Sequence, residues 1–325
     1  MYNFGRAGLI SIAYSSILII SLELLFLILA PRIYTVVNTL PLLFLSQILR
    51  IELFLFSLII SFIFFLFLFI SNFYDEVISL KLVLNFLTIS LIVFFFSILL
   101  NEKNKKKIRN DRVIVYLTLF SLLILGLLSF FFFSETEQNQ LRQYLNRFTD
   151  EFLKLKDIQS NIETSSLIET VVKIMPSINV FSFLLIFLFN FYVTKFFVNK
   201  FNFQIRYSFD IFEFEIPKII FLSFNIFFIL STILPSGINY LFLNLTIALS
   251  FLIFYEGFVS FFNSLKGLEI HNFLKIIIIF LLFIFLGYLL FLILFLLGFF
   301  INLKKMFKGL FNIWGFYGSY FIRKF

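Results

Sequence analysis

The sequence VIVYLTLFSLLILGLLSFFFF occupies residues 113–133 and contains no charged side chain. A soluble helix of this length would carry a polar face, whereas about 20 apolar residues are what an α-helix needs to cross a bilayer core of ~30 Å. A second uncharged run covers residues 276–301. Stretches of this kind predict transmembrane helices.

The overall composition agrees with folding in lipid. The chain has 325 residues, of which 61% are hydrophobic, 22% aromatic and only 14% charged. The net charge is +8, but the basic residues stand at the ends of apolar runs, which is the distribution that membrane topology requires and not that of a nucleic-acid-binding face. Cysteine is absent, which excludes disulfides and thiolate metal sites. The expected partner is the lipid bilayer, with no nucleic acid.

We predict an all-α fold, a polytopic transmembrane helical bundle of about nine spans, or eight if the second, interrupted by Pro41, is re-entrant. The predicted spans are 7–30, 33–49, 51–71, 77–100 and 113–133, followed after a polar segment by 178–198, 218–234, 240–261 and 274–301. The expected division is therefore helices in 1–133, an extramembrane helical segment in 134–177, helices in 178–301, and a basic and aromatic interfacial tail in 302–325.

The orientation follows from the basic residues, because short loops rich in Lys and Arg stay in the cytoplasm. The loop after the fourth span holds six of them, so we expect it inside and the segment 134–177 outside. One signal disagrees: nine spans place the basic residues after position 301 outside, so either a span is miscounted or the tail lies along the interface. The loop residues are Lys103, Lys105, Lys106, Lys107, Arg109 and Arg112; Arg50, Lys195, Lys200, Arg206 and Lys266 would share their side, and the discordant residues are Lys304, Lys305 and Lys308.

The excess of Phe, Ile, Asn and Lys over Ala and Gly suggests an AT-rich genome. This composition favours the cytoplasmic (inner) membrane of a bacterium, with an organelle inner membrane as the alternative.

The polar segment 134–175 resembles soluble protein. Apolar residues recur there at alternating spacings of four and three, and Ser166 and Glu169 have the spacing of a capping box that starts a second helix, expected to end before Pro176. The segment predicts a helical hairpin or cap that rests on the membrane surface or on its own bundle, or that acts as a lid or binds a membrane or peripheral protein partner. The apolar stripe consists of Leu141, Leu145, Phe148, Phe152 and Leu155.

Enzyme signatures are sparse. His271 is the only histidine, and no P-loop, GxSxG or dinucleotide-binding motif occurs. We therefore predict no enzyme, no cofactor and no metal site.

Polar residues inside the predicted spans are the better candidates for function, because each is costly in hydrocarbon unless it faces a partner or a water-filled cavity. Glu23 is the most deeply placed charge, and we expect its partner to be Lys81 or a bound solute. The amides, including Asn190, could instead be hydrogen-bonded links between helices. The candidate ligand-binding residues are Glu23, Lys81, Asn85, Asn225, Asn244, Tyr255 and Glu256.

Aromatic and acidic residues nearly alternate in the sequence FDIFEFEIP at residues 209–217. This alternation predicts an amphipathic strap in the cytoplasmic interface, with Pro217 in the first turn of the next helix.

The order of these features resembles the YybS-like family of predicted bacterial membrane proteins, a domain of unknown function. The matching features are Pro31 and Pro41 early in the chain, the polar segment ending at Pro176, the strap ending at Pro217, and Asn244 eleven residues before Tyr255-Glu256-Gly257. The family's C-terminal ending is only partly matched by Leu297-Gly298 and Leu303-Lys304. The resemblance extends distantly to the substrate-binding subunits of energy-coupling-factor vitamin transporters, which implies a solute site without identifying the solute.

Three function classes remain. The first is a solute-binding or transport-type membrane component, which predicts a polar cavity beneath the outer surface that contains Glu23. The second is a non-catalytic assembly or scaffold protein of the envelope, which predicts a dry bundle whose function lies in residues 134–175 and in the basic loop. The third, a lipid-modifying enzyme, would need polar groups that converge near one interface.

Overall fold

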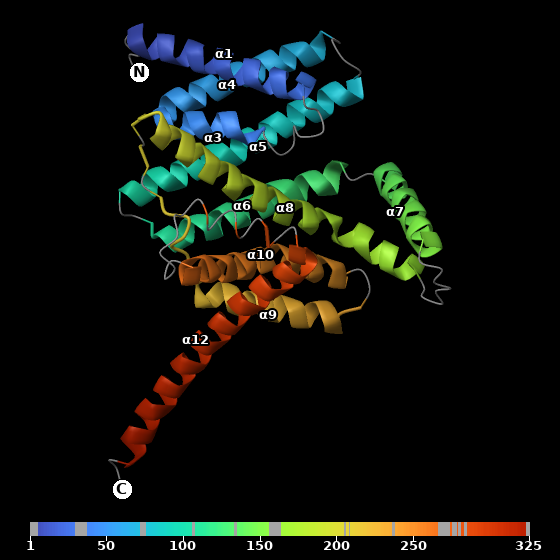
Figure 1. The fold of residues 1–325 in the computed structure, drawn as a ribbon, viewed down its shortest axis with the longest axis vertical. Coiled ribbons are helices and arrows are strands. Elements are labelled where there is room, and N and C mark those ends of the chain that lie inside the picture. Colours follow the sequence, from blue (N-terminus) through green and yellow to red (C-terminus); the bar gives the residue numbers. More distant parts are fainter. Residues whose placement is uncertain are drawn as a thin grey trace. The chain divides into compact units, whose positions relative to one another are not determined.

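The protein was analysed as a computed structural model that describes residues 6–29, 38–71, 76–105, 108–132, 135–155, 164–204, 206–207, 209–235, 238–265, 274, 278, 281–282 and 285–322. Within these residues the fold is all-helical, as predicted (Figure 1). The helices are α1 (Arg6–Leu29), α3 (Thr39–Ile48), α4 (Ile51–Ile70), α5 (Glu76–Asn104), α6 (Asn110–Phe132), α7 (Glu135–Leu155), α8 (Thr164–Lys200), α9 (Lys218–Ile233), α10 (Ile238–Ser264) and α12 (Tyr288–Ile322).

Seven of the described helices, α1, α4, α5, α6, α8, α10 and α12, are long and apolar enough to cross a membrane. Helix α9 has 16 residues and a length of about 24 Å, close to the bilayer core. Helix α3 has 10 residues and covers only about 15 Å, so this helix alone cannot span. Its shortness is compatible with the re-entrant alternative for the second predicted span.

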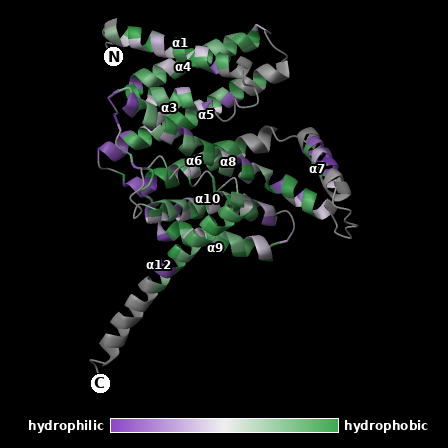
Figure 2. Cartoon of the chain, in the orientation of Figure 1, coloured by the Kyte–Doolittle hydropathy of each residue, from purple (hydrophilic) through white to green (hydrophobic). Residues whose placement is uncertain are grey.

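The surfaces of these helices are those expected in lipid. Large apolar side chains point outward along the spans, for example Phe67 at 64%, Ile70 at 74% and Ile219 at 70% exposure. Figure 2 shows hydrophobic residues over most of the helices and hydrophilic ones concentrated in α7 and in the connections. Apolar residues on the outside need a hydrocarbon solvent, which makes the chain an integral membrane protein.

The chain divides into two compact units. Unit 1 comprises residues 1–127 and 182–211, and unit 2 comprises residues 128–181 and 212–325. The core of unit 1 contains edge-to-face aromatic contacts in which Phe96 of α5 lies 5.2 Å from Phe187 and 5.1 Å from Phe191 of α8, and 5.9 Å from Phe209. In unit 2, Phe221 and Phe224 of α9 lie against Phe299 and Phe295 of α12.

The prediction that a short helix ends before Pro176 is wrong, because α8 runs through this proline from Thr164 to Lys200. A proline lacks the N–H donor and disturbs the helix around it. Asn244 of α10 compensates: its Nδ2 donates to the Lys173 carbonyl at 3.0 Å, and its Oδ1 accepts the Ser177 N–H at 3.3 Å. These are the backbone groups that an undisturbed helix would pair with each other, so the amide bridges the interruption.

The last predicted span also differs from the helix in the structure. Instead of one helix over 274–301, the structure has Gly287 at φ +48°, outside the right-handed helical region, and α12 starts at the next residue. No helix end occurs at Ile301, because α12 continues to Ile322. Residues 302–322 of the tail that was predicted as a separate element are therefore part of this helix.

Two glycines bring α10 and α12 into backbone contact. A Cβ added to Gly257 would lie 1.8 Å from the Leu294 carbonyl oxygen, and one added to Gly298 would lie 2.0 Å from the Ile253 carbonyl oxygen. Both distances are far inside van der Waals contact. Small residues at helix crossings in membranes allow this approach, where close packing replaces the hydrophobic effect as the driving force.

We expect Gly257→Ala and Gly298→Ala each to destabilise the protein by about 2 kcal/mol or more, because the rigid backbones would have to separate. Gly126→Ala is the matched control, since nothing lies within 4 Å of a Cβ added there and alanine favours the helix. Thermal unfolding of the purified variants in one detergent measures the difference. Equal melting temperatures for Gly298→Ala and Gly126→Ala would contradict the close crossing.

Candidate functional site

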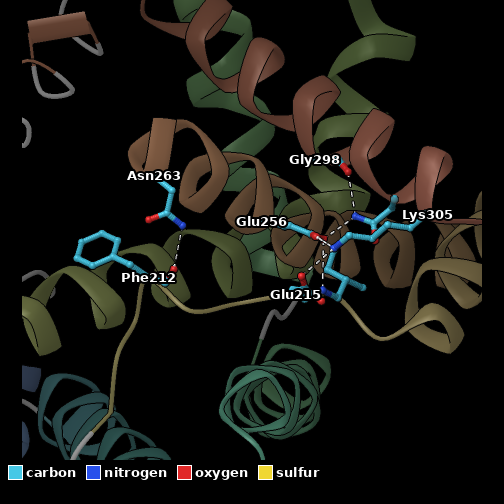
Figure 3. Close-up of polar contacts among 8 residues, drawn as sticks. Phe212, Glu215, Glu256, Asn263, Gly298 and Lys305 are labelled. Carbon is cyan, nitrogen blue, oxygen red and sulfur yellow. Dashed lines mark hydrogen bonds and ion pairs between the residues drawn. The ribbon is translucent and has the colours of Figure 1, made fainter. Parts of the chain in front are cut away.

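The most extensive set of polar contacts in unit 2 surrounds Glu256 of α10, whose side chain is only 4% exposed (Figure 3). Its Oε1 accepts a hydrogen bond from Lys305 Nζ at 2.8 Å. Its Oε2 accepts from the Asn302 amide and from the Ile216 backbone N–H at 3.3 Å. Lys305 also lies 3.5 Å from Glu215, whose side chain is 71% exposed. One lysine thus links a buried and an exposed carboxylate.

The sequence of α12 brings these donors together. Gly298, Asn302 and Lys305 follow one another at spacings of four and three, which place them on one face of a helix. The Asn302 Nδ2 also donates to the Gly298 carbonyl at 2.9 Å, which fixes the orientation of the amide. Because Glu256 directly precedes Gly257, the close crossing and the ion pair belong to the same contact between α10 and α12.

The second half of the strap, residues 212–217, adds a third segment to the site. Its residues alternate: Phe214 and Ile216 are buried at 5% exposure, while Glu213 and Glu215 are exposed. Phe214 packs against Tyr255 at 5.2 Å between ring centroids. This is the period of two that an extended chain gives, and the amphipathic strap predicted from the sequence is present.

The second half of the strap is also attached at its first residue, Phe212. The Phe212 ring stacks on Phe262 at 3.9 Å, and Asn263 Nδ2 donates to the Phe212 carbonyl at 3.3 Å (Figure 3). Its end leads directly into α9, with Pro217 as the residue before the first helical turn. The Glu256 site therefore joins α10, α12 and the start of α9.

Electrostatics explain why Glu256 has three donors. A carboxylate without partners in an apolar interior costs several kcal/mol, and a buried carboxylate persists only when paired and hydrogen-bonded. Lys305 suits this task because its side chain is 37% exposed, so the long stem can carry the ammonium from the surface to the buried acid. The arrangement acts as a latch that holds three segments at one place.

The first half of the strap is bound in unit 1. The Asn104 and Asn110 amides, at the two ends of the basic loop, donate to the carbonyls of Arg206 and Asp210 at 2.7 and 3.0 Å. Arg206 Nε in turn donates to the Ile48 carbonyl at the end of α3 at 3.0 Å. Burial raises the pKa of the Tyr207 hydroxyl, which keeps this phenol neutral. These contacts agree with the expectation that the strap, Arg50 and the basic loop share one membrane side.

The predicted ligand-binding residues are divided between the two units. Three belong to unit 1: Glu23 of α1 is 2% exposed, Asn85 of α5 is half-buried, and the side chain of Lys81 lies outside the described residues. The expected pairing of Glu23 with Lys81 therefore stays a prediction. Asn190, also in unit 1, donates to Thr39 Oγ1 and links α8 to α3.

The other four belong to unit 2. Asn225 donates to the Phe221 carbonyl of its own helix at 2.7 Å, and Asn244 bridges the interruption at Pro176. Tyr255 is buried among aromatic rings, and Glu256 is the centre of the latch. The amides of Asn190 and Asn244 act as the links between helices that the alternative interpretation expected.

Sequence reasoning missed Glu215, Asn302 and Lys305 as partners of Glu256. A signal for them was present in the spacing of Gly298, Asn302 and Lys305 and in the conflict over the side of the C-terminal lysines. Asn302 and Lys305 were instead predicted to belong to a tail beyond the last span.

The contacts of Lys305 bear on that conflict. Within unit 2, Lys305 contacts Glu215 of the strap and Glu256. Asp210 and Ile216 are six residues apart, at most about 20 Å, which is too short to cross the bilayer core, so we expect both halves of the strap on one membrane side. We therefore predict that Lys305 shares the side of the basic loop and that the chain crosses an even number of times between Ile216 and Lys305. Helices α9, α10 and α12 would provide three of these crossings, and α10 and α12 run in the same general direction (Figure 1).

We expect a reporter fused after Lys308 to lie on the same side as one inserted between Lys103 and Arg112, and both to be cytoplasmic. A reporter near Asn161 should lie on the opposite side. Paired alkaline phosphatase and fluorescent-protein fusions measure this. Opposite sides for the first two fusions would contradict the even number of crossings.

We expect Lys305→Met to destabilise the protein by about 1.5–3 kcal/mol, because it removes a charged hydrogen-bond donor from a buried carboxylate. Lys304→Met is the matched control, since Lys304 is exposed, and it should change stability by less than about 0.5 kcal/mol. Thermal unfolding in detergent measures both variants. In the Glu256→Gln background the Lys305→Met cost should shrink, and an unchanged cost would show that the two side chains are not coupled.

The comparisons with known proteins agree with this architecture. No curated protein matches the chain, and no solved structure matches it. Residues 16–300, which include most of the helices and Glu256 but end before Asn302 and Lys305, match the family described as "Predicted membrane protein (DUF2232)". The match covers well over half of the sequence, and the chain therefore belongs to this family of predicted membrane proteins of unknown function.

Proposed function

We propose that the protein is a solute-binding component of the transport type, with Glu23 as the charged group of its site. The observation that carries this proposal is the burial of Glu23, which is 2% exposed within the candidate span Ala7–Leu25. An acidic residue inside an apolar span is costly, and residues of this kind mark solute and ion pathways or proton relays in membrane proteins. A glutamate without a functional role in this span would instead be expected to extend its carboxylate to the membrane interface.

The surroundings of Glu23 support a polar site. Ser15 and Ser16 precede it by two turns and are buried against α4, where the Ser15 and Ser57 hydroxyls are hydrogen-bonded and Ser16 Oγ donates to the Ser57 carbonyl at 3.4 Å. Ser61, also buried, follows one turn later on α4. Because α1 and α4 run in the same direction (Figure 1), this row of hydroxyls extends toward the level of Glu23.

The chemistry of the row restricts the solute. A carboxylate accepts hydrogen bonds and attracts cations, and serine hydroxyls both donate and accept. Groups of this kind suit a small solute with an ammonium or several N–H and O–H donors, or an exchangeable proton. An anionic solute is disfavoured by the charge of Glu23.

The resemblance to the YybS-like family, and through it to the substrate-binding subunits of energy-coupling-factor transporters, supports the same function class. The composition supports a place in the bacterial cytoplasmic membrane. Both are parts of the proposal.

A non-catalytic assembly or scaffold role is the second candidate, and a specific observation favours it. The amides of Asn190, Asn244 and Asn302 are hydrogen-bonded to other protein groups, and α10 and α12 are in backbone contact, as in a dry bundle. This candidate requires no released solute, so ligand identification separates the two.

We expect Glu23→Gln to fold and insert normally but to lose bound solute, because it preserves size and hydrogen bonding while removing the charge. Glu23→Ala should also lose some stability. Untargeted mass spectrometry of small molecules released from the purified, denatured protein provides the measurement, with an unrelated membrane protein purified in parallel as the blank.

Glu52→Gln is the matched control: it makes the same change in the first turn of α4, and it should retain the solute. The proposal fails if the wild-type protein releases no enriched molecule, or if Glu23→Gln retains it at wild-type occupancy.

A further inference from the structure

Helix α7 has an apolar flank that the rest of the chain covers only partly. Leu141 and Leu145 are half-buried, while Tyr144 is 67% and Phe148 58% exposed. At 100° per residue these four side chains occupy one side of the helix, and Asn146 and Arg147 lie on the opposite side. The helix is therefore amphipathic, with one part of its apolar stripe turned toward α8 and the other turned outward.

Helix α7 is held in a definite place. Arg142 donates from Nε and Nη2 to the two carboxylate oxygens of Glu169 on α8, at 3.0 and 3.3 Å. Glu169 also pairs with Lys173 at 3.3 Å, and Lys173 Nζ lies 4.4 Å from the centroid of the Tyr240 ring of α10. A two-pronged arginine–carboxylate contact fixes orientation as well as distance. The direction in which Tyr144 and Phe148 point is thus set by the structure of unit 2.

The position of α7 along the chain places it at the membrane surface. It begins at Glu135, three residues after α6 ends at Phe132, and three residues reach at most about 10 Å. Its first turn therefore lies within that distance of the end of a transmembrane helix. Within unit 2, α7 lies across the direction of α10 (Figure 1), as a helix parallel to the bilayer plane would.

We propose that the flank formed by Tyr144 and Phe148 inserts into the phospholipid interface beside the spans. The occupant is lipid because α7 begins only two connecting residues after a candidate transmembrane helix and lies across the direction of α10. Aromatic residues are favoured at this depth, where their rings meet the headgroup boundary, and amphipathic helices bury their apolar faces about 5–10 Å into it. The inference is independent of the proposed solute site, because it concerns only how the extramembrane helix is anchored.

Tryptophan fluorescence in vesicles tests the proposal. With Trp314→Phe as the background, Phe148→Trp and Asn146→Trp place a single reporter on the apolar and polar sides of α7 in the full-length protein. Vesicles of phosphatidylcholine and phosphatidylglycerol, with and without acyl chains brominated near the headgroup, provide the quencher. We expect Phe148→Trp to emit at shorter wavelength and to lose more than half of its emission in the brominated vesicles, and Asn146→Trp to lose little.

Equal emission of Phe148→Trp in the two kinds of vesicle would overturn the proposal and indicate a protein partner or a second copy on this flank. Equal quenching at both positions would also overturn it, because the contact would then not belong to one face. Should Phe148→Trp fail to fold, Tyr144→Trp measures the same flank with a smaller change in shape.

Discussion

Water is absent from the bilayer core, so a polar group within a span is costly unless it has a partner inside the protein or faces a water-filled cavity. This constraint determines which helices meet in the structure. Asn244 is directed to the backbone groups at Pro176, Asn190 to Thr39, and Asn302 and Lys305 to Glu256. Apolar side chains are interchangeable between lipid and protein surroundings, whereas these few polar groups are not. They specify the packing of an otherwise uniform set of Phe- and Leu-rich helices.

The close crossing of α10 and α12 and the latch depend on each other. Gly257 and Gly298 let the backbones approach, and at that separation Asn302 and Lys305 contact Glu256. In return, the ion pair selects this register among the many that two apolar helices could adopt. A buried ion pair is weak evidence for net stability, because desolvation offsets the Coulomb attraction. Its contribution here is better understood as specificity of packing.

Hydrophobic pattern was sufficient to predict the class of fold, since long apolar runs such as residues 113–133 have no other stable form in lipid. The strap was predictable for a related reason, because a period of two is as clear a signal as an apolar run. The hydrophobic pattern did not predict helix ends correctly where a single residue decides them. Pro176 predicts a helix end unless Asn244 is present to bridge it, and Gly287 is one glycine among uniformly apolar neighbours.

The latch was missed because the membrane side of Lys305 depends on whether the number of crossings before it is odd or even. Nine spans would place Lys305 outside, and the sequence leaves open whether a span is miscounted or the tail lies along the interface, because one uncounted crossing reverses the side of everything that follows. The contact of Lys305 with Glu256 and Glu215, which the sequence does not display, favours a miscounted span. The sequence thus identified Glu23 and Glu256 as polar residues whose burial in lipid is costly. It did not identify the side chains that contact Glu256.

The two buried acids, Glu23 and Glu256, differ in what they can do. A solute that bound Glu256 would have to displace a lysine that is tethered to the same fold and held 2.8 Å away, and such tethering gives the lysine a high effective concentration. A reversible ligand competes poorly under those conditions, so Glu256 is better suited to a permanent link than to binding. Glu23 lies instead on a helix face shared with Ser15 and Ser16, whose hydroxyls donate to carbonyls of their own helix. A hydroxyl that donates in this way can still accept a hydrogen bond from a solute, which is why the proposed function is placed at Glu23 and the architecture at Glu256.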